Sequence, residues 1–223
     1  MSSSRRLGSP IICATSVSSY STLAARHPQT LAARLWITFR HIGLGHNAVL
    51  LDGGLRAWQA EQRPLETTAP VVARGSVQPR VRNDVLVDHA WVQQRITDGN
   101  AAILDARDEP FWTGAQHNTR RAARPGRVPG AINIPFRTLV DDNGRLLDRA
   151  QLQAAFTGAG VTPGQIVVTY CHVGQQASLL FVAAHVLGHD VRLYDGSFED
   201  WSRRLELPVE AGGRFEELES GNP

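Results

Sequence analysis

The segment IVVTYCHVGQQASLLFVAAHVL, residues 166–187, passes from a run of β-branched residues through a short loop to a long apolar stretch. This pattern predicts a central strand over Ile166–Tyr170 and a buried helix over Gln176–Leu187. Cys171 then lies directly after the strand, in the loop that opens the helix. Ligands of parallel α/β sheets bind beyond the carboxyl ends of the strands, so this loop is a candidate site.

Residues on both sides of this segment predict alternating strands and helices. Strands are expected at 101–104, 131–134 and 191–194, and helices at 88–97, 149–156 and from residue 197 onward. Asp88, Asp148 and Ser197 can cap the three helices, and Asp200 has the spacing that would complete a capping box with Ser197. Such alternation is typical of an α/β fold in which helices cover both faces of a parallel sheet.

Part of this pattern occurs twice. The sequence GHNAVLLDGGLRAW at residues 45–58 aligns without a gap with GHDVRLYDGSFEDW at residues 188–201. A helix-like stretch precedes each copy, at Gln29–Ile42 and Gln176–Leu187, and farther upstream Ser18–Ser21 aligns with Val168–Cys171. The second copy has room upstream for the rest of an α/β domain and the first does not. We therefore expect one complete domain and a partial second copy of it.

Composition restricts the partners and the compartment. The 223 residues carry a net charge of +2, too small to indicate nucleic acid, and no apolar run is long enough to span a membrane. All 23 basic residues are arginine, which excludes Schiff-base chemistry and a lysine-based phosphate loop. Cys13 and Cys171 are isolated from each other, which favours a reducing, cytoplasmic compartment. No histidine pair has metal-ligand spacing beside a cysteine.

A lone cysteine is most often a small buried hydrophobic residue, but the context of Cys171 favours a reactive thiol. The main-chain amides and the partial positive charge of a helix amino terminus lower the pKa of a thiol. Gly174 allows the turn that would bring several amides to one sulfur. We therefore expect the pKa of Cys171 to be lowered, and Cys13, which lacks this context, to be inert.

Four motifs follow one another in an order that resembles the rhodanese family. They are DAR at 105–107, GRVPGAINIP at 126–135, the six-residue loop from Cys171, and Asp195-Gly196 with Trp201. The resemblance covers residues 85–205 fully and 18–60 in part. It implies a two-domain sulfurtransferase with an inactive amino-terminal fold, here a truncated unit at residues 1–60, a linker at 61–84, the catalytic domain at 85–208 and a tail at 209–223.

The resemblance also implies a reaction and a site. Cys171 would take a sulfane sulfur as a persulfide from a small anionic donor, thiosulfate or a mercaptopyruvate-like compound, and pass it to a thiol or cyanide without a cofactor or a metal. The amides of residues 172–177 would form a cradle, and Ser21, aligned with Cys171, could not carry a persulfide. The implied substrate-binding residues are Arg107, His172, Val173, Gly174, Gln175 and Gln176.

Two departures from the family leave the donor open. The loop offers His172 where thiosulfate-preferring members place cations, and His172-Val173 differs from the small residues of mercaptopyruvate-preferring members. Arg127 stands where the family has histidine. Four arginines, Arg120, Arg121, Arg124 and Arg127, form either a solvated basic segment or a source of positive field over the pocket.

Two other functions are weighed against the sulfurtransferase. A cysteine phosphatase needs an arginine that closes the loop, and Gln176-Ala177-Ser178 provides none. A non-catalytic rhodanese that acts as a sulfur-relay or interaction module remains the alternative.

Overall fold

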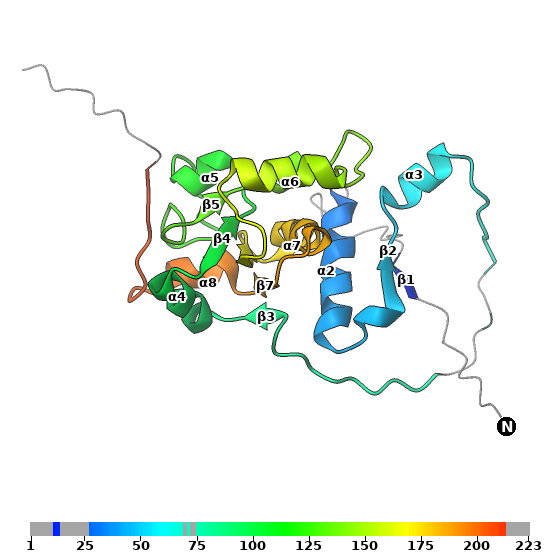
Figure 1. Ribbon diagram of the computed structural model, residues 1–223, viewed down its shortest axis with the longest axis horizontal. Coiled ribbons are helices and arrows are strands. Elements are labelled where there is room, and N and C mark those ends of the chain that lie inside the picture. Colours follow the sequence, from blue (N-terminus) through cyan, green and yellow to red (C-terminus); the bar gives the residue numbers. More distant parts are fainter. Residues whose placement is uncertain (1–10, 14–26, 69–70, 72–74, 213–223) are drawn as a thin grey trace, which may run out of the picture.

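The computed structural model describes residues 11–13, 27–68, 71 and 75–212. Its main sheet has five parallel strands in the order β3-β7-β6-β4-β5, so β6 lies at the centre (Figure 1). The predicted strands are present, and those at 166–170 and 191–194 have the predicted bounds. The strands are β3 (Leu86–Val87), β4 (Ala101–Asp105), β5 (Ile132–Asn133), β6 (Ile166–Tyr170) and β7 (Val191–Tyr194).

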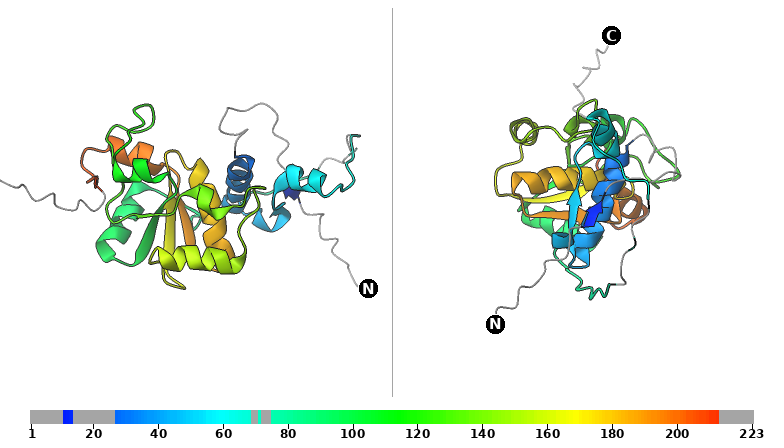
Figure 2. Two further views of the ribbon diagram at one scale, coloured as in Figure 1. Left: turned by 90° about the horizontal axis from the view of Figure 1, so that it is seen from above. Right: turned by 90° about the vertical axis from the view of Figure 1, so that its right-hand side faces the viewer.

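Helices cover both faces of this sheet, which confirms the predicted α/β fold (Figure 2). Successive side chains of a strand point to opposite faces, so Val167 packs in one apolar cluster and Val168 in the other. Residues of α6 and α7 share the first cluster, and residues of α4 and α8 share the second. The helices are α4 (His89–Asp98), α5 (Glu109–Thr113), α6 (Arg149–Gly158), α7 (Gln175–Leu187) and α8 (Ser197–Arg203), with a 3₁₀ turn, η2 (Phe136–Leu139).

Two of the three predicted helix caps are confirmed. The carboxylate of Asp88 accepts from the amide of Trp91 at 2.9 Å, and Asp148 forms a capping box with Gln151. The predicted capping box of Ser197 and Asp200 is wrong. Ser197 is itself the first residue of α8, with φ +53°, and its hydroxyl bonds outside the helix, while Asp200 accepts from the hydroxyl of Tyr194 at 2.6 Å.

Residues 11–13 and 27–60, which include the first segment of the predicted repeat, form a small unit, called the first unit below. Its strand β1 (Ile11–Cys13) pairs in parallel with β2 (Ala48–Leu50), and it also contains α2 (Pro28–His41), the 3₁₀ turn η1 (Gly45–Asn47) and α3 (Gly54–Ala60). Ile11 pairs with Ala48, whereas Val167 pairs with Val191, which aligns with Ala48. This pairing makes Ile11 the counterpart of Val167, six residues earlier than the alignment of Ser18 with Val168 predicts. Ser18–Ser21, which the alignment equates with Val168–Cys171, lies outside the described residues.

The first unit docks on the larger domain through its helix α2, which packs against α7 on one side and against β1 and β2 on the other (Figure 1). Ile37 of α2 is 1% exposed and belongs to the same apolar cluster as Phe181 of α7. The ring of Trp36 meets that of Phe181 edge-on at 6.4 Å. The first unit and the larger domain therefore share one core.

The domain around Cys171 extends beyond its predicted end at residue 208. Arg127 and Glu210 form an antiparallel bridge with main-chain bonds of 2.8 and 3.0 Å, and the amide of Gly212 bonds to the carbonyl of Thr113. Residues 85–212, called the second domain below, thus include the start of the predicted tail. The described residues between 61 and 84 contain no helix or strand. Within the described ranges, no helix combines the length and the apolar composition that crossing a bilayer requires.

Candidate active site

The loop that carries Cys171 leaves the carboxyl end of the central strand β6 and enters α7 at Gln175, one residue earlier than predicted. Gly174 caps the helix at φ +82°, a conformation that glycine adopts without a steric penalty. Cys171 is 1% exposed and belongs to the apolar cluster beneath α7. The side chain of Cys171 is therefore buried beneath the loop and is not exposed to solvent.

The main-chain amides of Ala177, Val173 and Gln176 act on the Cys171 thiol as hydrogen-bond donors and lower its pKa. They belong to the predicted cradle of residues 172–177. Burial raises the pKa of the Cys171 thiol, and these three amides lower it only in part. The prediction of a lowered pKa is wrong for this reason. The cradle instead offers three donors to negative charge that develops on the sulfur during a reaction.

The start of α8 holds the main chain of the loop. The amide of Cys171 donates to the hydroxyl of Ser197 at 3.3 Å, and the amide of Phe198 donates to the carbonyl of Cys171 at 2.9 Å. The amide of Glu199 donates to the carbonyl of His172 at 3.0 Å. Sequence reasoning assigned Ser197 to a helix cap and so missed its contact with Cys171.

The side chain of His172 is held beside the loop as a neutral ring. It meets Phe111 edge-on at 4.9 Å. Burial, and next the charge of Arg107, lower the pKa of His172 to about 4. Among the described residues, neither its Nδ1 atom nor Oε1 of Gln176 has a hydrogen-bond partner, although both atoms are buried. The loop thus presents polar atoms but no charged side chain.

Arg107, which was expected to border the pocket, has a buried side chain that pairs with Asp105. Its side chain is 2% exposed, its Nη2 atom lies 2.6 Å from the carboxylate of Asp105, and the same atom donates to the carbonyl of Gly126 at 2.8 Å. The guanidinium lies 4.2 Å from the ring centre of Phe198. Arg107 therefore links the carboxyl end of β4 to the segment at Gly126, and its charge lowers the pKa of His172.

The four arginines of the basic segment divide into two pairs. Arg124 donates to the carbonyls of Ser202, Arg204 and Leu207 at 2.8 to 3.0 Å. Arg127 lies 4.2 Å over the ring of Trp112 and donates to the carbonyl of Gly212 at 2.7 Å. Arg124 and Arg127 therefore connect the basic segment to residues 202–212 at the end of the second domain.

The other pair is closer to the solvent and to the loop. Arg121 lies 3.5 Å from the carboxylate of Glu199 and contributes to the lowered pKa of His172. Arg120 is exposed and lines an open pocket together with Phe111 and His117. Of this segment, Arg121 has a charge that acts on His172 in the loop.

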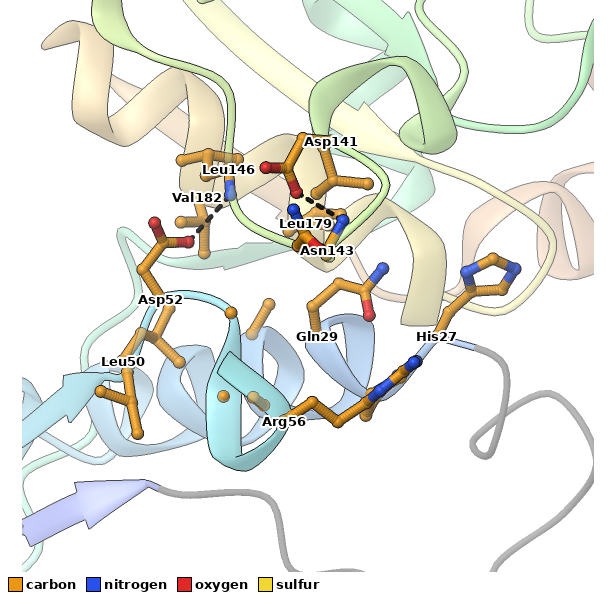
Figure 3. A pocket seen from close by; sticks show the side chains of 18 of the residues that line it. His27, Gln29, Leu50, Asp52, Arg56, Asp141, Asn143, Leu146, Leu179 and Val182 are labelled. Carbon is orange, nitrogen blue, oxygen red and sulfur yellow. Dashed lines mark hydrogen bonds between the residues drawn. The ribbon is translucent and has the colours of Figure 1, made fainter. Parts of the chain in front are cut away.

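A cavity of about 890 Å³ lies apart from the thiol, between the first unit and the second domain (Figure 3). Gln29 and Arg56 reach it from the first unit, and Leu179 and Val182 of α7 from the second domain. Asp52 at its edge accepts from the amide of Leu146 at 2.8 Å. Cys171 is not among its lining residues.

Two further contacts link the first unit to the turn after β7 and to the start of α7. Nη2 of Arg34 lies 2.5 Å from Oδ1 of Asp195, and Nε2 of Gln175 donates to the hydroxyl of Thr30 at 3.3 Å. Sequence reasoning did not identify Arg34, because nothing in the sequence shows which side of α2 faces α7.

Comparison with known proteins places these features in context. The model of the rhodanese-like domain matches residues 88–204. The chain is 33% identical over 189 residues to SseB of Mycobacterium tuberculosis, covering 81% of this chain and 63% of that protein. It is 31% identical over 180 residues to the 3-mercaptopyruvate sulfurtransferase of Escherichia coli, covering 80% of this chain and 63% of that protein.

A third relative and a solved structure agree with these matches. The thiosulfate sulfurtransferase of Azotobacter vinelandii is 31% identical over 161 residues, covering 72% of this chain and 58% of that protein. The anaerobic ergothioneine biosynthesis enzyme from Chlorobium limicola superposes with a TM-score of 0.73 at 20% identity, over 82% of this chain and 46% of that chain. This last likeness concerns the fold alone. The chain thus spans less than two thirds of the length of these relatives.

Proposed function

Because this chain belongs to the rhodanese family, we propose that it is a sulfurtransferase that carries a sulfane sulfur as a persulfide on Cys171. The family and the named relatives support sulfur transfer between a donor and an acceptor. The observation that carries the proposal is the set of three amides on the sulfur of Cys171, at the carboxyl end of the central strand. Cys171 is the proposed nucleophile, and the loop His172–Gln176 is the proposed donor-binding site.

The proposed reaction has two displacement steps. After the thiol loses its proton to a solvent base, the Cys171 thiolate attacks the outer sulfur of thiosulfate. A sulfur–sulfur bond forms to Cys171, the old one breaks, and its electron pair leaves with sulfite. A thiol or cyanide then attacks the outer sulfur of the persulfide, and the electron pair returns to Cys171. In both steps negative charge on the Cys171 sulfur faces the amides of Val173, Gln176 and Ala177.

A mercaptopyruvate-like donor is the other proposed substrate class. In that case the carbon–sulfur bond breaks instead, and the carbon atom is protonated as the keto acid leaves. The neutral His172 in the loop gives no cation for either anionic donor. A donor panel on the purified protein would compare the two by kcat/KM.

The first unit is proposed to be catalytically silent. The sequence alignment equates Ser21 with Cys171, and a hydroxyl cannot form a persulfide. No residue from 14 to 27, between β1 and α2, is a cysteine. We propose a reducing, cytoplasmic compartment on the basis of the two isolated cysteines.

The burial of Cys171 favours one second candidate, a sulfur-relay or interaction module without turnover. A buried thiol with a raised pKa reacts slowly with small molecules. Such a module would accept sulfur from a protein partner and would not use thiosulfate.

One experiment tests the proposal. The protein is incubated with thiosulfate, and its intact mass and its peptides are measured, with Cys171→Ser as the control. We expect one added sulfur on the Cys171 peptide, none on the Cys13 peptide, and release of that sulfur as thiocyanate when cyanide is added. Absence of the added sulfur on Cys171, or transfer by Cys171→Ser at the wild-type rate, contradicts the assignment.

A further inference from the structure

The guanidinium of Arg34 lies against the glycine of the Cys171 loop, although Arg34 belongs to the first unit. A Cβ atom placed on Gly174 would lie 3.1 Å from Nη1 of Arg34 and 3.3 Å from Oδ1 of Asp195. Nη1 belongs to the guanidinium whose other nitrogen, Nη2, pairs with Oδ1 of Asp195, and this ion pair joins α2 to the turn after β7. The pair therefore leaves no space for the main chain at Gly174 to move toward α2.

A buried side chain of α2, that of Thr30, contacts Gln175, the residue after Gly174. Thr30 is 1% exposed, and its hydroxyl donates to the carbonyl of His27 at 2.8 Å and accepts from the side chain of Gln175 at 3.3 Å. Gly174, which caps α7, and Gln175, its first residue, are thus both held from the first unit.

These two residues lie between the amides that bind the sulfur. Val173 precedes Gly174, and Gln176 and Ala177 follow Gln175. The hydroxyl of Ser178 donates to the carbonyl of Gly174 at 2.7 Å and so transmits the position of Gly174 to the first turn of α7. A shift at Gly174 would therefore turn the three amides away from Cys171.

The repeat supplies an independent argument for contact across the two units. Asp52 aligns with Asp195, and each follows the last strand of its copy. Asp195 binds Arg34 of the first unit, while Asp52 accepts from the amide of Leu146 in the second domain. Each aspartate thus binds a residue of the other unit.

From these contacts we propose that Arg34 is a positioning residue for the Cys171 loop. Through Asp195 it fixes Gly174, and so it keeps the amides of the loop directed at the sulfur. The first unit then completes the active site of the second domain although it supplies no thiol of its own. The consequence for turnover rests on the proposed function, but the effect on the thiol does not.

The test compares Arg34→Met, Asp195→Asn and the double variant with the wild type. The rate of alkylation of Cys171 is followed by peptide mass spectrometry with neutral iodoacetamide and with anionic iodoacetate. Sulfur transfer from thiosulfate is measured on the same samples. Arg145→Met is the matched control, because Arg145 of the second domain pairs with Glu61, the residue directly after the first unit, with similar exposure and away from the loop.

If the pair positions the loop, both single variants lower the alkylation rate, by about tenfold, and to the same extent with both reagents. Removal of a whole hydrogen-bond donor costs roughly a hundredfold or more, so a partial misalignment gives a smaller loss. The double variant is no slower than either single one, because the two residues act as one pair. Arg34→Lys restores part of the rate, and Arg145→Met leaves it unchanged.

A simple effect of charge predicts a different result. Loss of the Arg34 charge would then slow iodoacetate more than iodoacetamide, and Asp195→Asn would accelerate both reagents, since it removes a negative charge beside the loop. That outcome, or wild-type rates in both single variants, overturns the proposal. If the wild type itself does not transfer sulfur from thiosulfate, the proposed function is refuted. The role of Arg34 is still tested in that case, because the alkylation rates report on the loop without any turnover.

Discussion

The hydroxyl of Ser197 accepts a hydrogen bond from the main-chain amide of Cys171 at 3.3 Å and donates one to the carbonyl of Tyr194 at 3.0 Å. Ser197 is fully buried and has φ +53°, a conformation that few residues with a side chain adopt. The side chain therefore joins the end of β7 to the start of the Cys171 loop.

Ser197→Ala should destabilise the protein by about 1 to 3 kcal/mol, because the buried amide of Cys171 loses its partner. Ser197→Gly loses the same bonds but relieves the left-handed backbone, so it should be more stable than Ser197→Ala. Urea unfolding measures both. Both variants should slow persulfide formation alike, and equal stability of Ser197→Ala and the wild type would show that the hydroxyl does not support the loop.

Arg107→Met should lower the free energy of unfolding by about 3 to 5 kcal/mol, because it leaves the fully buried carboxylate of Asp105 without its cation. The double variant Arg107→Met/Asp105→Asn should recover part of this loss. Arg192→Met, at the exposed pair with Asp190, is the control and should change stability little. A small effect of Arg107→Met would mean that Asp105 is satisfied by main-chain donors alone.

Within the basic segment, Arg121 should affect the binding of the donor, and Arg124 should affect the stability of the fold. Arg121→Gln should raise the KM for thiosulfate about twofold to fivefold at low salt, with the difference vanishing at high salt, because Arg121 acts through its field. Arg124→Gln should leave this salt dependence unchanged and destabilise the fold by about 1 to 3 kcal/mol, because buried carbonyls lose their donor. Steady-state kinetics at several salt concentrations and urea unfolding distinguish the two. The reverse assignment would be required if Arg124→Gln alone changed the KM.

The depressed pKa of His172, about 4 against an ordinary 6.5, predicts a pH-dependent stability. Between these two values the unfolded chain binds a proton at this site that the folded chain does not bind. The contribution of His172 is therefore fully present above pH 6.5 and is lost as the pH falls toward 4.

His172→Gln should accordingly flatten the slope of unfolding free energy against pH between 6.5 and 4. The measurement is urea unfolding at a series of pH values for the variant and the wild type. His46→Gln, in the turn η1 of the first unit, is the control for a histidine remote from the loop. Identical slopes for His172→Gln and the wild type would place His172 in contact with water.

The elements around the site could be predicted because their patterns are local. The β-branched run at 166–170 and the apolar stretch after it require a buried strand and a buried helix, and both occur within one residue of the predicted bounds. Asp88 and Asp148 cap helices that begin at the next residue, which spacing alone can indicate. The position of Cys171 follows directly from these elements.

The electrostatics and the long-range contacts could not be predicted from local patterns. The pKa of Cys171 depends on how completely the core encloses the sulfur, and spacing does not report burial. Ser197 has the residue type and spacing of a helix cap, yet its partner lies on another strand end. Arg124 and Arg127 looked like members of a solvated cluster, and their carbonyl partners come from segments distant in the chain.

The apolar cluster that contains both Ile37 and Phe181 should make the first unit and the second domain unfold together. Because α2 and α7 fill one interior, calorimetry should record a single endotherm for both copies of the repeat. A chimaera that carries the first unit of a relative should therefore fold stably only if α7 is taken from the same relative.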